Sequence, residues 1–209
     1  MRPVLDLSVY VVTDPDAPHP PEAVALAAAR GGAKAVQLRD KRASDEELTR
    51  LARRLVGLLA PHGVALIVND RPEVARAAGA AGAHVGQGDM DPRRARTILG
   101  PEAVLGLSIE TAAQLAAVPP GVVDHLGVGP VRATATKPDA AAPLGVEGLA
   151  AVRAAAAAPV VAIGGLTAAD AAAVRGTGAV GMAVVSAVCR AEDPEAAVRE
   201  LRAAWEAGR

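Results

Sequence analysis

The sequence is poor in aromatic residues and in cysteine. It has one Tyr, one Trp and no Phe among 209 residues, so it lacks the aromatic side chains on which proteins stack single-stranded nucleic acid. Cys189 is the only cysteine, which excludes an internal disulfide and a cluster of thiolate metal ligands and is typical of a reducing compartment. We therefore expect an aliphatic core and a cytoplasmic protein.

The chain also lacks an excess of charge of either sign and a long apolar run. Lys and Arg number 22 against 23 Asp and Glu, a formal net charge of -1, which does not favour a nucleic-acid surface. No apolar run approaches the ~20 residues that cross a membrane. Residues 1–6 lack the charged start and apolar core of a signal peptide. We expect a protein that binds neither nucleic acid nor membranes.

Apolar, strand-like runs alternate regularly with helix-start signals. Pro20-Pro21 and the pair Ser44 and Glu47, a capping box, each mark a helix start. The expected strands are 7–13, 33–38, 64–68, a short one at 84–85, 104–107, 122–128, 159–163 and 179–185. The expected helices are 20–30, 44–59, 72–78, 92–99, 110–118, 146–157, 168–175 and 194–207.

Eight strand-helix units in order predict an α/β fold, a single (β/α)8 TIM barrel spanning residues 1–209 as one domain. The strands are nearly continuously apolar and no hairpin signal separates them, as in a parallel sheet covered on both faces. Single barrels begin near ~200 residues, close to the length of this chain. The alternative is an open doubly wound sheet, which usually has a glycine-rich first turn, whereas this chain has Thr13-Asp14-Pro15-Asp16 there.

Several of the expected strands end in polar residues, and in such a barrel the carboxyl ends of the strands form the site. Gln37, Arg39 and Lys41 occupy alternate positions, so they point the same way if the strand continues through them. Asn69 and Ser108 end two other strands as neutral donors. We expect these five side chains to meet at one mouth.

Asp70 and Asp89 follow consecutive strands, and neighbouring strands lie ~4.8 Å apart. Two carboxylates at that spacing can share a hard cation, which predicts a Mg²⁺ site. The alternative is that each caps a following helix, because Pro72 and Pro92 come soon after. The two roles can coexist.

Basic residues and glycines add two anion sites to the same mouth. Arg39, Lys41 and Lys137 bring positive charge from separate elements, which with Mg²⁺ suits a diphosphate, although each could be a solvated surface charge. Gly164-Gly165 and Val185-Ser186 follow the last two strands, where barrels commonly bind a phosphate. We therefore expect two small phosphorylated substrates.

No residue stands out as a catalytic base or nucleophile. His84 is a candidate base, but alternation counted along the strand and its turn places it opposite to Gln87 and Asp89. That position favours a packed histidine or one that supports a site residue. Cys189 follows the last strand without a His or Asp that the sequence places beside it. Chemistry without a protein nucleophile is favoured.

The connection at residues 129–144 is longer than the usual loop and contains Thr134, Thr136 and Lys137. Long loops in compact domains are typically lids or binding loops. The alternative is a disordered insertion, which Pro138-Asp139 and the alanines after it would suit.

Nine segments in order resemble the thiamine phosphate synthase family over nearly the whole chain. They are YVVTD at 10–14, VQLRDK at 36–41, VNDR at 68–71, HVGQGD at 84–89, LGLS at 105–108, GVGP at 127–130, TATK at 134–137, AIGG at 162–165 and VVS at 184–186. No single segment is specific, but their order is.

The resemblance implies a Mg-dependent transferase that joins 4-amino-2-methyl-5-(diphosphooxymethyl)pyrimidine to a thiazole phosphate, releasing diphosphate and giving thiamine phosphate. It implies one Mg²⁺ per subunit, held by Asp70 and Asp89. The residues implied for the pyrimidine diphosphate are Gln37, Arg39, Lys41, Asn69, Ser108 and Lys137, of which Arg39, Lys41, Ser108 and Lys137 would be catalytic. Those implied for the thiazole phosphate are Thr134, Thr136, Gly165, Val185 and Ser186.

The sequence departs from the family pattern at two positions that we expect near the long loop. Arg132 stands where an aromatic residue is usual, and His125 where a tyrosine is usual. The competing functions are a related thiazole tautomerase, a sugar-phosphate isomerase or epimerase, and a non-enzymatic regulator that binds a phosphorylated ligand. The sequence does not decide between a monomer and a homo-oligomer.

Overall fold

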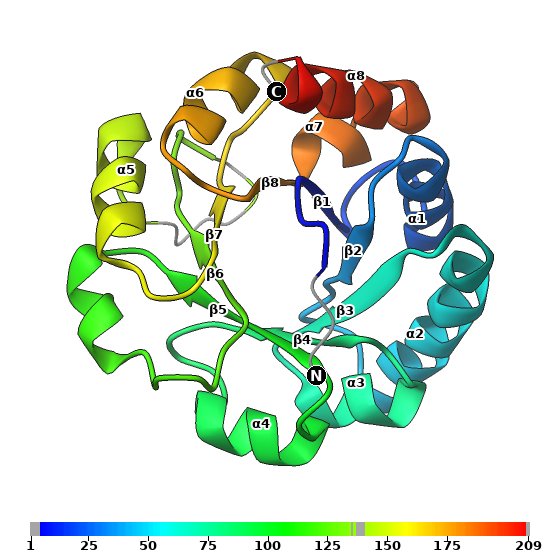
Figure 1. Cartoon of the computed structure of the whole chain (residues 1–209). Helices are drawn as coiled ribbons and strands as arrows, with labels where there is room; N and C mark the ends of the chain where they lie inside the picture. The colour runs from blue at the N-terminus through cyan, green and yellow to red at the C-terminus, as the bar shows by residue number, and fades with distance from the viewer. Residues whose placement is uncertain (1–4, 135, 137–140, 208–209) are drawn as a thin grey trace.

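The computed structural model describes residues 5–134, 136 and 141–207, and eight of its strands close into a barrel (Figure 1). The strands are β1 (Val9–Val12), β2 (Ala35–Leu38), β3 (Ala65–Asn69), β4 (Gly82–Val85), β5 (Val104–Ile109), β6 (His125–Val128), β7 (Val160–Ile163) and β8 (Gly181–Val184). Each pairs with its neighbours in parallel, and β1 pairs with β8. The predicted (β/α)8 barrel is confirmed.

Helices surround the barrel, as the view along it shows (Figure 1). They are α1 (Pro21–Arg30), α2 (Asp45–Leu59), α3 (Pro72–Ala78), α4 (Pro92–Leu99), α5 (Gly145–Ala155), α6 (Ala171–Gly176), α7 (Ser186–Cys189) and α8 (Pro194–Glu206), with 3-10 helices η1 (Ala60–His62), η2 (Ala112–Ala117) and η3 (Ala168–Asp170). In the described part of the chain, none of them has both the length and the apolar character needed to span a membrane.

Local sequence signals place most of the helix starts. Proline occupies the first turn of α1, α3, α4 and α8, where its missing N–H costs nothing. Ser44 caps α2 and exchanges hydrogen bonds with Glu47, so the predicted capping box is present. The α-helix expected at 110–118 is instead the 3-10 helix η2, which ends before Val118, where the following Pro119 favours an extended conformation. The short helix α7 was not predicted.

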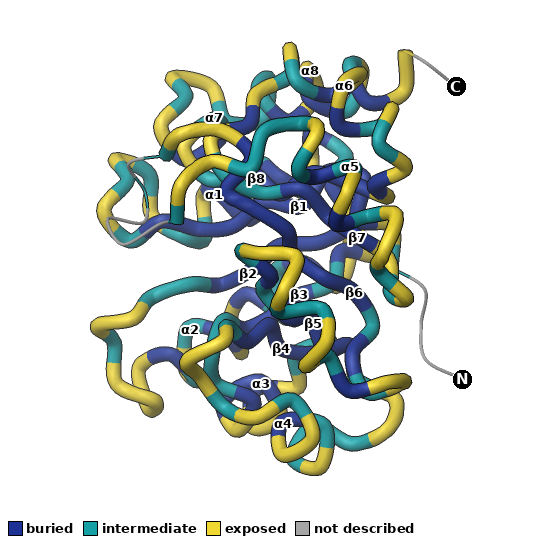
Figure 2. Tube along the Cα trace, turned by 90° about the vertical axis from the view of Figure 1, so that its left-hand side faces the viewer, coloured by how far each residue is buried: buried dark blue, intermediate teal, exposed yellow. Residues whose placement is uncertain are grey.

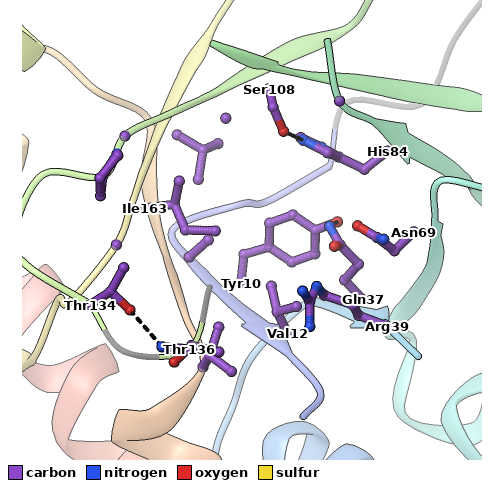
Figure 3. A pocket seen from close by; sticks show the side chains of 18 of the residues that line it. Tyr10, Val12, Gln37, Arg39, Asn69, His84, Ser108, Thr134, Thr136 and Ile163 are labelled. Carbon is purple, nitrogen blue, oxygen red and sulfur yellow. Dashed lines mark hydrogen bonds between the residues drawn. The ribbon is translucent and has the colours of Figure 1, made fainter. Parts of the chain in front are cut away.

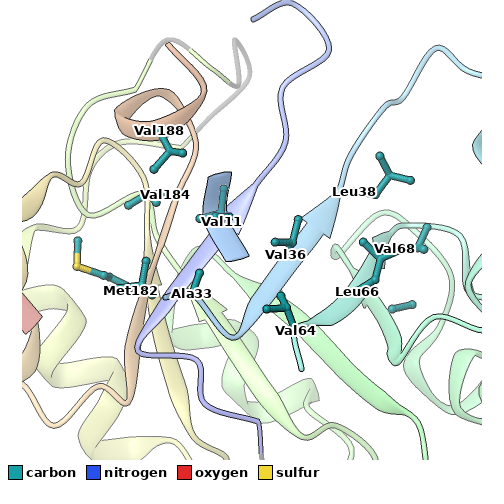
Figure 4. Packing of buried hydrophobic residues seen from close by; sticks show 14 of the residues in the cluster. Val11, Ala33, Val36, Leu38, Val64, Leu66, Val68, Met182, Val184 and Val188 are labelled. Atoms are coloured by element: carbon teal, nitrogen blue, oxygen red, sulfur yellow. The ribbon is translucent and has the colours of Figure 1, made fainter. Parts of the chain in front are cut away.

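The core has two layers, one outside the strands and one inside. Side chains such as Val11, Val36 and Val68 point outward and pack under the helices (Figure 4). The inner cluster consists of Leu7, Tyr10, Val12, Ala35, Ile67, Val104, Val161 and Ala183. Buried residues accordingly follow the strands, while exposed residues lie on loops and outer helix faces (Figure 2). This aliphatic core is what the shortage of aromatic residues predicts.

The floor of the barrel interior also holds two buried histidines, His84 and His125, which are 8% and 1% exposed. Loss of hydration lowers the pKa of His84 to about 3, and repulsion from His125 adds to this effect. Loss of hydration likewise lowers the pKa of His125 to about 4, against a smaller opposite effect of Asp124. Both rings are therefore neutral at neutral pH.

Close packing of strand starts requires glycine at Gly181. A Cβ added there would lie 1.7 Å from the backbone oxygen of Leu7, which cannot move without breaking the pairing of β1 with β8. We expect Gly181→Ala to cost at least about 3 kcal/mol of unfolding free energy, the upper range for overpacked cores. Gly57→Ala is the matched control: it lies within α2 with open space around it, and should gain about 0.5–1 kcal/mol. Urea denaturation measures both, and equal stabilities would contradict this account.

The buried histidines predict a pH dependence of stability. The folded-state pKa values of His84 and His125 lie below the ordinary value of 6.5, so the unfolded state binds more protons between those values. Stability should therefore fall as the pH is lowered from about 6.5 toward 4. The His125→Tyr variant lacks one imidazole. Denaturation across this range should show that the slope of its unfolding free energy against pH is smaller by the equivalent of about one proton. An unchanged slope would show that His125 does not contribute to the pH dependence of stability.

Candidate active site

A cavity of about 380 Å³ opens at the carboxyl ends of the strands (Figure 3). Its lining includes all of the predicted site residues that the structure describes, namely Gln37, Arg39, Lys41, Asn69, Asp70, Asp89, Ser108, Thr134, Thr136, Gly165, Val185 and Ser186. Lys137 lies outside the described residues. The polar strand ends thus meet in one place, as the barrel topology requires.

Gln37, Arg39 and Lys41 all line the cavity, but β2 ends at Leu38, so the strand alternation that would give them a common direction does not continue through Arg39 and Lys41. Gln37 is buried, and its amide donates a hydrogen bond to the Tyr10 hydroxyl at 2.8 Å. The Lys41 Nζ lies 3.3 Å from an oxygen of Asp70. Within the described part of the chain, the Arg39 guanidinium forms no ion pair, so its charge remains available at the mouth.

Asp70 and Asp89 lie side by side in this cavity, at the ends of β3 and β4. The pKa of Asp70 is raised by burial and by the neighbouring carboxylate of Asp89, against a smaller opposite effect of Lys41. The exposed Asp89 accepts a hydrogen bond from the Gly86 N–H at 2.8 Å. The pair therefore concentrates negative charge that Lys41 only partly balances.

Neither aspartate caps a helix, so the alternative role expected for them is wrong. The residue before α3 is Arg71, with no side-chain cap, and α4 is capped by Asp91, which accepts from the N–H groups of Arg93 and Arg94. Asp70 instead adopts a left-handed backbone with φ of 62°, which Asp tolerates better than most residues. Its N–H donates to the His84 carbonyl at 2.7 Å.

On the opposite side of the cavity, Gly164 and Gly165 follow β7 with φ of 101° and 63°. A Cβ on Gly165 would lie 2.4 Å from the backbone oxygen of Ala133, so glycine is required for the turn to contact the start of the long loop. The Arg132 N–H donates to the Gly164 carbonyl at 2.9 Å. The turn and the loop threonines are thus brought together.

The loop threonines and the end of β8 complete this side. The Thr136 N–H donates to the Thr134 hydroxyl at 3.3 Å, a contact drawn in Figure 3. Val185 immediately follows β8, and the exposed Ser186 is the first residue of α7. Backbone and hydroxyl donors from three elements therefore border the same region.

His84 points into the barrel and lines the cavity together with Gln87 and Asp89, so the expectation that it faces the opposite way was wrong. The strand alternation ends at Val85, and the turn that begins at Gly86 does not continue it. The expectation of a packed, supporting histidine is confirmed, because His84 is buried and its Nε2 lies 3.0 Å from the Ser108 hydroxyl oxygen (Figure 3).

Cys189 is fully buried, and its thiol donates to the Val12 carbonyl at 3.2 Å. Burial raises its pKa to about 11. Asp14 lies close enough to affect this thiol, a neighbour that the sequence did not indicate. The environment still disfavours the thiolate, and Cys189 is not a nucleophile at neutral pH.

The two departures from the family pattern do not lie together. The Arg132 Nε donates to Asp170 at 3.0 Å, so its guanidinium is held at η3 and not in the cavity. His125 was expected near the long loop, but it lies on β6 with its ring in the barrel interior. His125 is close to the long loop in sequence, but it lies at the start of β6 and the loop follows the end of that strand.

Sequence reasoning missed several further residues that line the cavity, among them Tyr10, His125 and Gln87. Tyr10 and Val12 alternate on β1 and both point inward, which the strand pattern would have shown. Gln87 donates to the Ser108 carbonyl at 2.7 Å, a contact that no sequence pattern indicates.

Comparison with known proteins gives a consistent result. A sequence model of the thiamine monophosphate synthase family matches residues 9–188. Thiamine-phosphate synthases of Xanthobacter autotrophicus and Azorhizobium caulinodans are 52% and 48% identical over 206 residues, covering 98% of this chain in both cases and 98% and 97% of the relatives. The solved structure of thiamine phosphate pyrophosphorylase from Pyrococcus furiosus has a TM-score of 0.88 at 34% identity, covering 97% of this chain and 96% of that one. The chain therefore belongs to the thiamine monophosphate synthase family.

Proposed function

We propose that the cavity joins 4-amino-2-methyl-5-(diphosphooxymethyl)pyrimidine to a thiazole phosphate, releasing diphosphate and forming thiamine phosphate. Thiamine-phosphate synthesis by a transferase follows from the family, whereas the substrates and their placement are the proposal. The observation that carries it is the meeting of a carboxylate pair, basic side chains from β2 and a glycine turn after β7 in one cavity.

Asp70 and Asp89 would hold the Mg²⁺ ion. Burial and the neighbouring carboxylate of Asp89 both raise the pKa of Asp70, and a cation between the two carboxylates would offset their repulsion. A pair of carboxylates suits Mg²⁺, which is usually bound through one or two carboxylates and takes its other ligands from water and phosphate. When bound, the ion neutralises charge on phosphate oxygens.

Arg39 and Lys41 would stabilise the departing diphosphate. The free guanidinium of Arg39 suits bidentate binding of phosphate oxygens, and Lys41 supplies a compact charge next to Asp70. Lys137 would add a third charge, an assignment that rests on the sequence motif alone. The aminopyrimidine can stabilise a methylene cation, so lowering the charge on the diphosphate favours dissociation of the carbon–oxygen bond.

The second substrate would bind on the side of the glycine turn. Backbone N–H groups near Gly165 and Ser186, with the hydroxyls of Thr134 and Thr136, provide donors for a monophosphate. This places the two phosphorylated groups on opposite sides of the cavity and the reacting atoms between them, so that catalysis consists mainly of positioning.

This reaction does not require a base from the protein. The pKa of His84 is lowered to about 3, too low for an efficient base at neutral pH, and Cys189 is a buried thiol outside the cavity lining. A thiazole nitrogen attacks with its own lone pair and loses no proton in forming the new carbon–nitrogen bond.

The direct test is to mix both substrates with the protein, with and without Mg²⁺, and to measure thiamine phosphate and diphosphate. We expect both products in equal amounts with Mg²⁺ and little of either in EDTA. A tautomerase or a phospholigand-binding regulator would release no diphosphate, and that result would overturn the proposal.

Asp70→Asn separates the metal role from a structural one. Asn also tolerates a left-handed backbone and removes the repulsion from Asp89, so the variant should fold with undiminished thermal stability. Its Mg-dependent turnover should fall on the order of 10²-fold or more, the scale of losing one electrostatic stabiliser. Full activity would contradict the assignment.

The matched control is Asp193→Ala, which removes a true cap. The Asp193 carboxylate accepts from the Ala196 N–H at the start of α8, away from the cavity lining. This variant should lose about 1 kcal/mol of stability and keep its turnover. Asp70→Asn should therefore lose activity and keep its stability, whereas Asp193→Ala should lose stability and keep its activity.

A further inference from the structure

His84 and His125 come from β4 and β6, two strands that do not pair with each other. Both are register partners of Gly106 on the intervening strand β5. A Cβ on Gly106 would lie 2.2 Å from the Nδ1 of His84 and 2.4 Å from the Nε2 of His125. The missing side chain therefore leaves the space in which the two rings meet.

The rings form a chain of polar contacts that leads to the cavity. The Nε2 of His125 lies 3.3 Å from the Nδ1 of His84, and the Nε2 of His84 lies 3.0 Å from the Ser108 hydroxyl. The far end of the chain is the Nδ1 of His125, which is buried and has no hydrogen-bond partner among the described residues. Three side chains on three adjacent strands are thus connected.

Neutral histidine carries one ring proton, so the chain can run in only two directions. If Ser108 donates to His84, then His84 donates from Nδ1 to His125, and His125 must bury an unpaired Nδ1–H. If the direction is reversed, His125 donates from Nε2, His84 donates from Nε2 to Ser108, and the unpaired atom is an acceptor. Unpaired buried N–H groups are the rarer of the two in proteins, which favours the second direction.

We propose that His125 and His84 form a relay of fixed Nε2–H tautomers that donates to one of the two lone pairs of the Ser108 oxygen and leaves the Ser108 hydroxyl proton to donate toward the cavity. His84 and His125 act as positioning residues in this arrangement. It rests on the proposed function in one respect: the acceptor would be a ring nitrogen or phosphate oxygen of the aminopyrimidine diphosphate.

The relay explains why two histidines are buried in the floor of the barrel without an acidic partner in contact. Both rings are buried, which disfavours their charged forms, and only a neutral His84 can have its tautomer set by its neighbour. A rotating serine hydroxyl would otherwise sample both donor and acceptor orientations. Fixing it removes that freedom before the substrate binds.

The first test is an ¹⁵N-resolved NMR spectrum of the histidine rings in the unmodified protein, which distinguishes Nε2–H from Nδ1–H tautomers. We expect the Nε2–H form for both His84 and His125. An Nδ1–H form, a charged ring or a mixture at either residue would overturn the relay. This measurement requires no variant and no turnover.

The second test is a matched pair at the distal position. In His125→Tyr the phenol hydroxyl can still donate to the Nδ1 of His84, whereas His125→Phe keeps an aromatic ring without a donor. We expect His84 to keep its Nε2–H tautomer in His125→Tyr and to become a mixture in His125→Phe. The KM for the pyrimidine diphosphate should rise roughly 10-fold in His125→Phe only, the scale seen when an orienting partner is removed. Equal tautomers and equal KM in the two variants would overturn the relay.

Failure of the relay and failure of the proposed function are distinguishable. If the unmodified protein makes thiamine phosphate but His84 is the Nδ1–H tautomer, the relay alone is wrong. If both rings are Nε2–H and no diphosphate is released in the synthase assay, the proposed function alone is wrong.

Discussion

The pairing of β1 with β8 closes the sheet, and the geometry of the cavity depends on it. An open parallel sheet would distribute the ends of its strands along a line, whereas closure brings the ends of β2, β3, β4 and β5 around the same opening as those of β7 and β8. Residues as distant as Arg39 and Ser186 thereby border one cavity. The small residues at the strand starts, such as Gly181, permit that closure because their backbones approach so closely.

Electrostatics divides the cavity into a charged rim and a neutral floor. Charged side chains such as Lys41 and Asp89 lie at the exposed rim, where water lowers the cost of charge and anionic substrates enter. Tyr10 and His84 lie deeper, and burial holds both in the neutral form, since it raises the pKa of the phenol and lowers that of the imidazole. The Asp70 backbone connects the two regions through its hydrogen bond to the His84 carbonyl.

The sequence predicted the barrel and the rim because both follow from short-range patterns. Apolar alternation and the proline and serine signals locate the elements, and topology then gathers the polar strand ends, as Gln37 and Arg39 illustrate. The meeting of His84 and His125 in the floor was not predicted, because it depends on a contact across β5. Similarly, no local pattern distinguishes a site aspartate such as Asp70 from a helix cap such as Asp91; only the backbone conformation does.

Gly106 has a consequence for how sequences of this kind can vary. Only a hydrogen atom fits at position 106 against the rings of His84 and His125. The residues at these three positions on β4, β5 and β6 are therefore expected to change together. A larger residue at position 106 becomes acceptable only when both rings are replaced by something smaller, because an added Cβ would clash with each of them. Replacing one of these residues with that of a relative should therefore destabilise the protein, whereas replacing all three together should be neutral. This non-additivity is a form of epistasis set by the register of neighbouring strands.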